Sequence, residues 1–181
     1  MSHTEVYLIR HAAPDWARTD IPYHLPPGPP LTAQGEAEAR ALGHFLRGLA
    51  LPRLYCSPLE RTRRTAEIAG GAAGLHYQVL DELIEWQPGE ETDAVGRRME
   101  TALQQALSAG GNGRPAALIT HGGPVGALLL RLGMPEPVLE NWRKFDRRNP
   151  LPTAGAWRAV RPGQDAPWQF ELVFTPEVVL S

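Results

Sequence analysis

The sequence has a single cysteine, Cys56, among its 181 residues. One cysteine cannot form an intrachain disulfide or supply the thiolates of a Cys-based zinc site, so both kinds of site are excluded. A long apolar run near the amino terminus is also missing. The first apolar run, Val6–Ile9, is short and is followed directly by Arg10. A signal peptide needs a longer apolar core and a membrane span needs about 20 apolar residues. We therefore expect a cytoplasmic protein without a membrane segment.

Excess charge of either sign is missing too. The 18 Lys and Arg residues nearly balance the 20 Asp and Glu residues, and the formal net charge at pH 7 is -2. A protein that binds nucleic acid by neutralising backbone phosphates carries an excess of positive charge, so this class is disfavoured and any phosphate chemistry must come from a local site. A chain of this length buries roughly 70% of its unfolded surface, so residues 1–181 are expected to fold as one domain.

Strand and helix patterns alternate along the chain. Short apolar segments predict strands at 6–9, 54–56, 76–80 and 116–119, followed by two candidate edge strands at 155–160 and 168–174. Apolar residues at helical spacing predict helices at 32–49, 57–69, 92–107 and 125–132. Residues 14–30 contain six prolines and no period, which predicts an ordered loop. The alternation is typical of an α/β domain whose mostly parallel sheet is covered on both faces.

The second helix has a clear start signal in Ser57-Pro58-Leu59-Glu60. Ser57 is expected to be the N-cap, Pro58 suits the first helical position, and Glu60 completes a capping box. We expect this helix to end at Gly70-Gly71.

Three predicted strands end at residues that can bind or attack an anion. Arg10 and His11 follow the first strand, and Arg61 lies one helical turn beyond the second. His121 follows the strand at 116–119 and precedes Gly122, at the start of a helix. In open α/β sheets ligands bind at the carboxyl ends of the strands, where helix amino termini also favour anions. Arginine suits such a site because its planar fork binds two oxyanion oxygens.

Taken singly, each of these residues is more often ordinary surface polarity or a packed interior group. Three separate strand ends that offer cationic or nucleophilic groups favour one phosphate or carboxylate site instead. The remaining histidines have no such setting and are expected to be structural: His3, His24, His44 and His76.

Several motifs occur in an order that resembles the histidine phosphatase superfamily, also called phosphoglycerate mutase-like. They are Arg10-His11-Ala12, Pro30-Leu31-Thr32-x-x-Gly35, Ser57-x-x-x-Arg61-x-x-x-Thr65-Ala66, Glu82 and Thr120-His121-Gly122. They span about residues 6–132, and together they are specific, whereas any one alone is weak. The resemblance implies a three-layer α/β/α sandwich with a mostly parallel central sheet.

The resemblance also implies roles for individual residues. His11 would be the nucleophile that forms a phosphohistidine, and Glu82 would be the proton donor. Arg10, Arg61 and His121 would hold the phosphoryl group, with Gly122 beside them at the helix start. No metal or other cofactor is implied. The expected substrate is a small phosphorylated metabolite, and neither a nucleic acid nor a membrane is an expected partner.

These roles are chemically coherent. A neutral imidazole can attack phosphorus in line, and two arginines with a protonated His121 would stabilise the charge on the phosphoryl oxygens. An ordinary carboxyl group has a pKa of about 4.3 and is ionised at pH 7. A bound phosphate dianion favours the protonated carboxyl, which Glu82 needs as a donor. Asp81 is the nearest rival donor, and Asp81, Glu82 and Glu85 could also be solvated loop carboxylates.

Three positions depart from the family pattern. Ala12 stands where glycine is commonest, Ala17 where many members have asparagine, and Gly28 where an aspartate often precedes the Pro-Leu-Thr segment. The segment between Glu82 and Thr120 is also short. These departures favour hydrolysis of a phosphomonoester over mutase-type transfer. Two further alternatives are a non-catalytic module that binds a phosphorylated ligand and a metal hydrolase that uses His11 and Asp15.

Two further segments are left open by the sequence. The Pro14–Pro30 loop, with its Trp16, Tyr23 and His24, is expected to roof the pocket together with Trp86, or to contribute only packing. The basic cluster Arg143–Arg148 could meet an acidic partner or form a solvated face. Nothing in the sequence indicates the oligomeric state.

Overall fold

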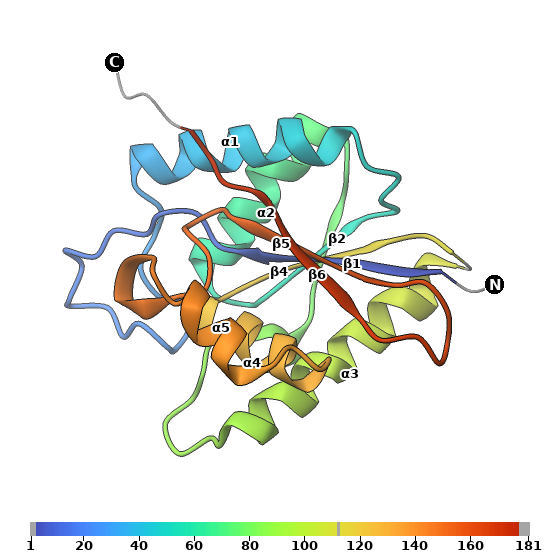
Figure 1. Cartoon of the computed structure of the whole chain (residues 1–181). Coiled ribbons are helices and arrows are strands. Elements are labelled where there is room, and N and C mark those ends of the chain that lie inside the picture. Colours follow the sequence, from blue (N-terminus) through green and yellow to red (C-terminus); the bar gives the residue numbers. More distant parts are fainter. Residues whose placement is uncertain (1–2, 112, 178–181) are drawn as a thin grey trace.

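Strands and helices alternate in the computed structural model, which describes residues 3–111 and 113–177 (Figure 1). The strands are β1 (Thr4–Arg10), β2 (Leu54–Cys56), β3 (Tyr77–Val79), β4 (Ala116–Thr120), β5 (Ala156–Arg161) and β6 (Gln169–Phe174). The helices are α1 (Ala33–Arg47), α2 (Glu60–Ala73), α3 (Thr92–Gly110), α4 (Gly122–Arg131) and α5 (Glu136–Trp142). Single 3-10 turns lie at Asp81–Leu83 and Asp146–Arg148. Within the described ranges, no helix is both long and apolar enough to cross a bilayer.

One six-stranded sheet runs through the molecule in the order β3-β2-β4-β1-β5-β6. The first four strands in this order are parallel, and β5 and β6 are antiparallel to their neighbours. Arg10 at the end of β1 is paired with Thr120 at the end of β4, and Cys56 of β2 is paired with Ile119. The register therefore brings His11, Ser57 and His121, each one residue beyond a strand, to the same edge of the sheet.

Helices cover both faces of the sheet. Helices α1 and α2 lie on one face, and α3, α4 and α5 lie on the other (Figure 1). Successive β1 residues point to opposite faces, so Ile9 packs with the α1 and α2 residues Leu42 and Ala66, and Leu8 packs with Leu103 and Leu128 of α3 and α4. The predicted three-layer α/β/α sandwich with a mostly parallel sheet is thus confirmed.

Helix α2 differs from its prediction at both ends. It begins at Glu60, with Leu59 at the N-cap position and no side-chain cap, and the Ser57 hydroxyl accepts a hydrogen bond from the Leu59 amide at 3.3 Å. The helix continues through Gly70 and ends at Ala73, and its C-cap Gly74 is in the left-handed conformation. Packing explains why a glycine stands inside this helix, because a Cβ at Gly70 would lie 2.6 Å from the Leu75 carbonyl oxygen. Close approach outweighs the low helix propensity of glycine here.

The carboxyl-terminal part also differs in detail. Strand β5 is not an edge strand, because it lies between β1 and β6, and only β6 is at that edge. Helix α5 was not predicted, and its start after Pro135 follows the preference of proline for helix amino termini. The first helix was expected over residues 32–49, and α1 ends two residues earlier, at Arg47, with Gly48 at the C-cap.

A glycine at the start of α1 is required by the chain that follows His11. Thr32 caps α1 by accepting a hydrogen bond from the Gly35 amide at 3.0 Å, and a Cβ at Gly35 would lie 2.1 Å from the Ala13 carbonyl oxygen. We expect Gly35→Ala to lower the free energy of unfolding by about 1–3 kcal/mol, because backbone must move to relieve the clash. Gly71→Ala on α2 meets no atom within 4 Å, and we expect it to raise this free energy by about 0.5–1 kcal/mol. Urea unfolding of both variants checks the pair, and equal effects would contradict the packing argument.

Candidate active site

Two histidines lie close together at the carboxyl ends of the parallel strands. The ring centroids of His11 and His121 are 5.3 Å apart, and the two residues are 1% and 0% exposed. Arg10 and Arg61 are buried beside them, at 1% and 0% exposed. The structure therefore places four of the five residues that were predicted to bind a phosphoryl group, Arg10, His11, Arg61 and His121, in one cluster.

The turn after His11 is fixed by side chains from two helices. The Ala12 amide donates to the Thr65 hydroxyl of α2 at 3.0 Å, and the Ala13 amide donates to the buried Glu38 carboxylate of α1 at 2.9 Å. Neither contact was predicted, although Thr65 belongs to the recognised motif. These bonds hold the backbone that carries the His11 ring.

The protonation state of His11 follows from its neighbours. Its Nδ1 lies 2.8 Å from the Ala12 carbonyl oxygen, which can only accept, so Nδ1 carries the proton and Nε2 carries the lone pair. Burial and the charges of Arg61 and Arg10 hold the pKa of His11 well below its usual 6.5. The ring is therefore neutral near pH 7, with Nε2 available for attack. The Tyr23 hydroxyl lies 3.4 Å from this Nε2.

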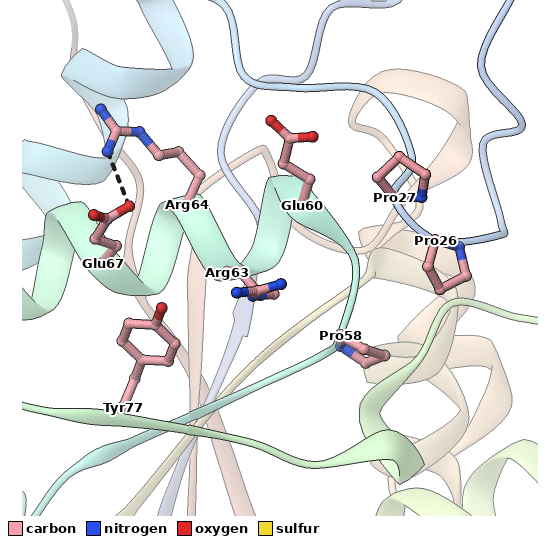
Figure 2. Close-up of a pocket in the computed structure, with 8 residues that line it drawn as sticks. All are labelled: Pro26, Pro27, Pro58, Glu60, Arg63, Arg64, Glu67 and Tyr77. Atoms are coloured by element: carbon pink, nitrogen blue, oxygen red, sulfur yellow. Dashed lines mark hydrogen bonds and ion pairs between the residues drawn. The ribbon is translucent and has the colours of Figure 1, made fainter.

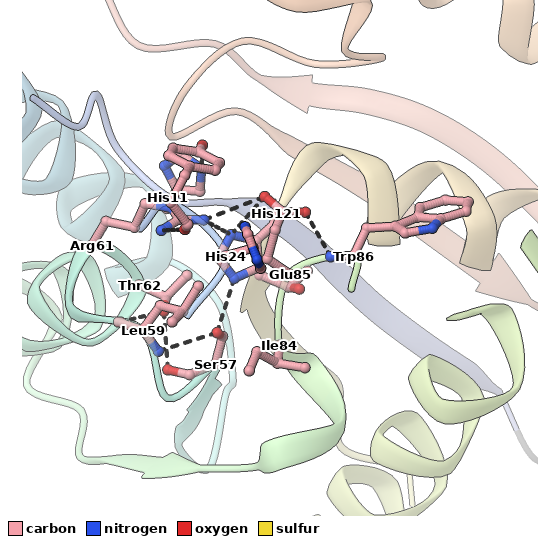
Figure 3. Close-up of polar contacts among 12 residues, drawn as sticks. His11, His24, Ser57, Leu59, Arg61, Thr62, Ile84, Glu85, Trp86 and His121 are labelled. Atoms are coloured by element: carbon pink, nitrogen blue, oxygen red, sulfur yellow. Dashed lines mark hydrogen bonds and ion pairs between the residues drawn. The ribbon is translucent and has the colours of Figure 1, made fainter. Parts of the chain in front are cut away.

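Arg61 connects the elements of the site. Its Nη1 donates to the Tyr23 carbonyl oxygen at 2.7 Å. Its Nη2 lies 3.1 Å from His121 Nδ1 and 3.3 Å from Glu85 Oε2 (Figure 3). The first turn of α2 directs this guanidinium across the ends of β1 and β4. A positive charge is thereby fixed between the second histidine and a carboxyl group.

His121 was expected to be protonated, and the free site favours the neutral ring instead. Its Nε2 lies 2.9 Å from the Ser57 hydroxyl, while Nδ1 faces the Arg61 guanidinium, which can only donate. Burial and the charge of Arg61 lower the pKa of His121 well below 6.5. Ser57 was predicted as a helix cap, and its hydroxyl contacts a site histidine instead.

The carboxyl group at the site is Glu85 rather than Glu82. Glu85 Oε2 lies 3.3 Å from both Arg61 Nη2 and His121 Nδ1. The Glu82 carboxylate points to α3, where it accepts a hydrogen bond from Gln105 on the exposed side at 3.3 Å. The prediction that placed Glu82 in the site is therefore corrected, and Glu85 takes its place.

Local backbone geometry explains why Glu85 and not Glu82 faces inward. The 3-10 turn Asp81–Leu83 buries Leu83, and Ile84 then has an extended backbone, so Glu85 lies on the same side as Leu83. Arg98 of α3 fixes this path by donating to the Ile84 carbonyl oxygen at 2.7 Å. The sequence signal was the apolar Leu83 two residues earlier, which marks the inward side.

Glu85 has the properties of a proton donor. Burial raises the pKa of Glu85, and the hydrogen bond from the Trp86 amide and the charge of Arg61 offset only part of this effect. Its Oε1 accepts from that amide at 2.9 Å, which leaves Oε2 facing His121 and Arg61. A carboxyl group with a raised pKa can keep a proton at a higher pH than an exposed one.

Aromatic side chains of the 14–30 loop cover the cluster. The Trp16 and Tyr23 rings are stacked with centroids 5.3 Å apart, and the Arg61 guanidinium carbon lies 3.9 Å from the Tyr23 ring centroid. Arg147, from the predicted basic cluster, lies 3.7 Å over the Trp16 ring. The loop therefore forms the roof that the sequence suggested, and part of the basic cluster packs against it.

Gly122 begins α4 directly after His121. A Cβ at this position would lie 1.7 Å from the Asn149 Oδ1 atom, so only glycine lets the segment around Asn149 approach the site. The phosphate contact predicted for Gly122 stays a prediction.

A side pocket of about 470 Å³ adjoins the cluster and shares Glu85 and Tyr23 with it. Its other lining residues are His24, Trp86, Gln87, Pro88 and Gly89. His24, expected to be structural, is thus part of the site's surroundings. A separate groove of about 580 Å³ on α2 is lined by none of the predicted site residues (Figure 2).

Two buried donors in the cluster have no acceptor. Within the described part of the chain, Arg10 Nε and Arg61 Nε are buried and make no hydrogen bond. A buried N–H group without a partner is costly, and a bound oxyanion would satisfy both. The arrangement fits an anion held next to a nucleophilic imidazole.

Comparison with known proteins agrees with this geometry. The family profile described as "Histidine phosphatase superfamily (branch 1)" matches residues 6–90. A probable phosphoglycerate mutase GpmB from Klebsiella pneumoniae is 30% identical over 165 residues, covering 72% of this chain and 76% of that protein. The chain belongs to the histidine phosphatase superfamily.

Solved structures of other superfamily members have the same fold. A mycobacterial glucosyl-3-phosphoglycerate phosphatase matches with a TM-score of 0.72 at 20% identity, covering 94% of this chain and 98% of that one. YhfR from Bacillus stearothermophilus matches with a TM-score of 0.73 at 20% identity, covering 97% and 98%. A phosphoglycerate mutase from Bacillus anthracis matches with a TM-score of 0.72 at 15% identity, covering 95% and 93%. These likenesses concern the fold, and they include both phosphatases and a mutase.

Proposed function

We propose that this histidine phosphatase superfamily member is a metal-independent phosphatase, which hydrolyses a small phosphomonoester through a phosphohistidine on His11. One observation carries the proposal: a neutral His11, with the lone pair on Nε2, is buried beside His121, Arg10 and Arg61. Glu85 lies next to them as the proton donor. We also propose, from the sequence alone, that the enzyme is cytoplasmic.

In the first step His11 Nε2 attacks the phosphorus in line, and the phosphorus–oxygen bond to the leaving group breaks. The carboxyl group of Glu85 gives its proton to the leaving oxygen and becomes a carboxylate. The guanidinium groups of Arg10 and Arg61 stabilise the charge on the other phosphoryl oxygens. The phosphate dianion raises the proton affinity of His121, which then adds positive charge.

In the second step the Glu85 carboxylate takes a proton from a water molecule as the water oxygen attacks phosphorus. The phosphorus–nitrogen bond breaks, and its electron pair returns to His11 Nε2. Inorganic phosphate leaves with the oxygen from water, and Glu85 is again protonated. The reaction thus divides one difficult hydrolysis into two transfers.

The leaving group is proposed to occupy the side pocket. Glu85 belongs both to this pocket and to the histidine cluster, so its proton is delivered at their boundary. None of the residues that line the pocket is Lys or Arg. A carboxylate on the leaving group, as in a phosphoglycerate, would lie near Glu85, and no cation of this lining would offset the repulsion between them. The pocket therefore favours phosphomonoesters with uncharged leaving groups, and hydrolysis over mutase chemistry.

Phosphoglycerate mutase-type transfer is the second candidate, because the relatives at about 30% identity carry that name. A panel of phosphorylated metabolites, assayed with a chelator present, separates the two. Release of inorganic phosphate without a phosphorylated isomer supports hydrolysis. Conversion of 3-phosphoglycerate into an isomer supports transfer, and phosphate binding without turnover of any substrate would indicate a non-catalytic module. Activity lost with the chelator and restored by a metal ion would overturn the metal-independent mechanism.

The dependence of kcat/KM on pH provides a separate prediction. Below the pKa of His11, which burial and Arg61 hold well under 6.5, the nucleophile takes a proton and the rate falls. Above the raised pKa of Glu85 the donor loses its proton, and the rate for alkyl phosphates falls again. We expect a maximum on the acidic side of neutrality. A profile that keeps rising through pH 8 would contradict both assignments.

A further inference from the structure

The Arg10 side chain is held by a carboxylate from a distant part of the chain. Its Nη1 and Nη2 donate to the two oxygens of Asp146, each at 2.7 Å. Nη1 also donates to the Leu151 carbonyl oxygen at 3.2 Å. Arg10 is only 1% exposed, so these bonds fix one end of a buried guanidinium group.

The hydrogen bonds to Asp146 leave the other edge of Arg10 unoccupied. Of its five N–H groups, the bonds above use both on Nη1 and one on Nη2. Nε has no hydrogen-bond partner in the described parts of the chain. The Nε–H and the second Nη2 N–H lie along one edge, which matches two oxygens of a phosphoryl group. Asp146 and a phosphoryl group can therefore bind Arg10 at the same time.

Asp146 is presented by a backbone that is unusual for its sequence. It begins the 3-10 turn Asp146–Arg148, in which Arg147 and Arg148 have φ values of 51° and 57°. Arginine rarely adopts this left-handed conformation, and such strain persists only where the surroundings fix it. Two contacts do so here: the Asn149 side chain donates to the Asp146 carbonyl oxygen at 3.0 Å, and Arg147 packs on Trp16.

We propose that Asp146 is a positioning residue that orients Arg10 for the phosphoryl group, an inference that rests on the proposed function. Its side chain is 46% exposed, and ion pairs with an exposed partner add little to stability. A role in stability alone does not account for two strained residues next to it. The Arg10 charge also acts on the carboxylate: burial raises the pKa of Asp146, but the hydrogen bonds from Arg10 outweigh this and lower it overall.

The test compares Asp146→Ala and Asp146→Asn with the unmodified protein. We expect kcat/KM to fall about 10- to 100-fold in Asp146→Ala, because a misplaced Arg10 meets the phosphoryl group poorly. The dissociation constant of inorganic phosphate, measured by calorimetry, should rise in parallel. Asp146→Asn keeps the size of the side chain and one acceptor oxygen, so its losses of kcat/KM and of phosphate affinity should be intermediate. Circular dichroism checks that both variants fold.

Two controls separate positioning from a general effect. Glu67→Ala removes another arginine–carboxylate contact, in which Arg64 donates to the exposed Glu67 carboxylate at 2.9 Å on α2, and it should change neither kcat/KM nor the dissociation constant of phosphate. In an Arg10→Ala background, Asp146→Ala should cause no further loss, because its effect passes through Arg10.

Each outcome decides the inference. Wild-type phosphate affinity and kcat/KM in Asp146→Ala would overturn it, as would losses that add fully to those of Arg10→Ala. In either case an unmodified protein that hydrolyses phosphomonoesters leaves the proposed function standing. If the unmodified protein neither hydrolyses a phosphomonoester nor binds phosphate, the proposed function fails and this inference fails with it.

Discussion

Replacing His11 by alanine is expected to lower kcat/KM by on the order of 10⁴-fold or more, because the proposed covalent intermediate forms on this ring. The Ala12 carbonyl oxygen accepts the Nδ1 proton of the His11 ring, which leaves the lone pair on Nε2 available for attack. Phosphate release from a panel of monoesters measures the loss.

His44→Ala is the matched control for this change. His44 lies on the exposed side of α1, near its carboxyl end, and the variant should keep full activity. His11→Ala should still bind inorganic phosphate, because Arg10 and Arg61 remain. Activity of His11→Ala within tenfold of the unmodified protein would show that catalysis does not pass through this residue.

Replacing Glu85 by glutamine is expected to have the second largest effect. With an alkyl phosphate, loss of the proton donor should lower the rate about 10²- to 10⁴-fold. With 4-nitrophenyl phosphate the leaving group departs without a proton, so one equivalent of 4-nitrophenolate should still appear in a rapid burst. Turnover should then be slow, because the second step lacks its base.

Glu82→Gln tests the competing assignment. The Glu82 carboxylate accepts a hydrogen bond from the Gln105 side chain on the exposed face of α3, away from the histidine cluster. We expect this variant to behave like the unmodified protein with both substrates. A large loss in Glu82→Gln, with normal rates in Glu85→Gln, would reverse the correction made from the structure.

The convergence of Arg10, His11, Arg61 and His121 could be predicted because it depends on topology. Each residue follows a strand that the apolar pattern identified, and the parallel register brings these strand ends together. The sandwich itself was predictable for the same reason. The ends of the helices were less predictable. Helix α2 continues through Gly70, whose close contact with the Leu75 backbone cannot be recognised from the local sequence.

Contacts made across the chain could not be predicted. Asp146 lies 136 residues beyond Arg10, and no local pattern links the two. Of the three carboxylates Asp81, Glu82 and Glu85, it is Glu85 that faces the site. The 3-10 turn and one extended residue, Ile84, separate it from strand β3 and turn its side chain inward. That choice depends on a single backbone step, and a one-residue difference directs the side chain to the other face.

The central claim is that the phosphoryl group passes through His11 Nε2. Its most direct test is to mix the protein with a labelled phosphomonoester, quench within milliseconds, and map the label by mass spectrometry. The account predicts one acid-labile, base-stable phosphate on His11, attached at Nε2, and none in His11→Ala. A label on Ser57, or turnover without any labelled histidine, would contradict it.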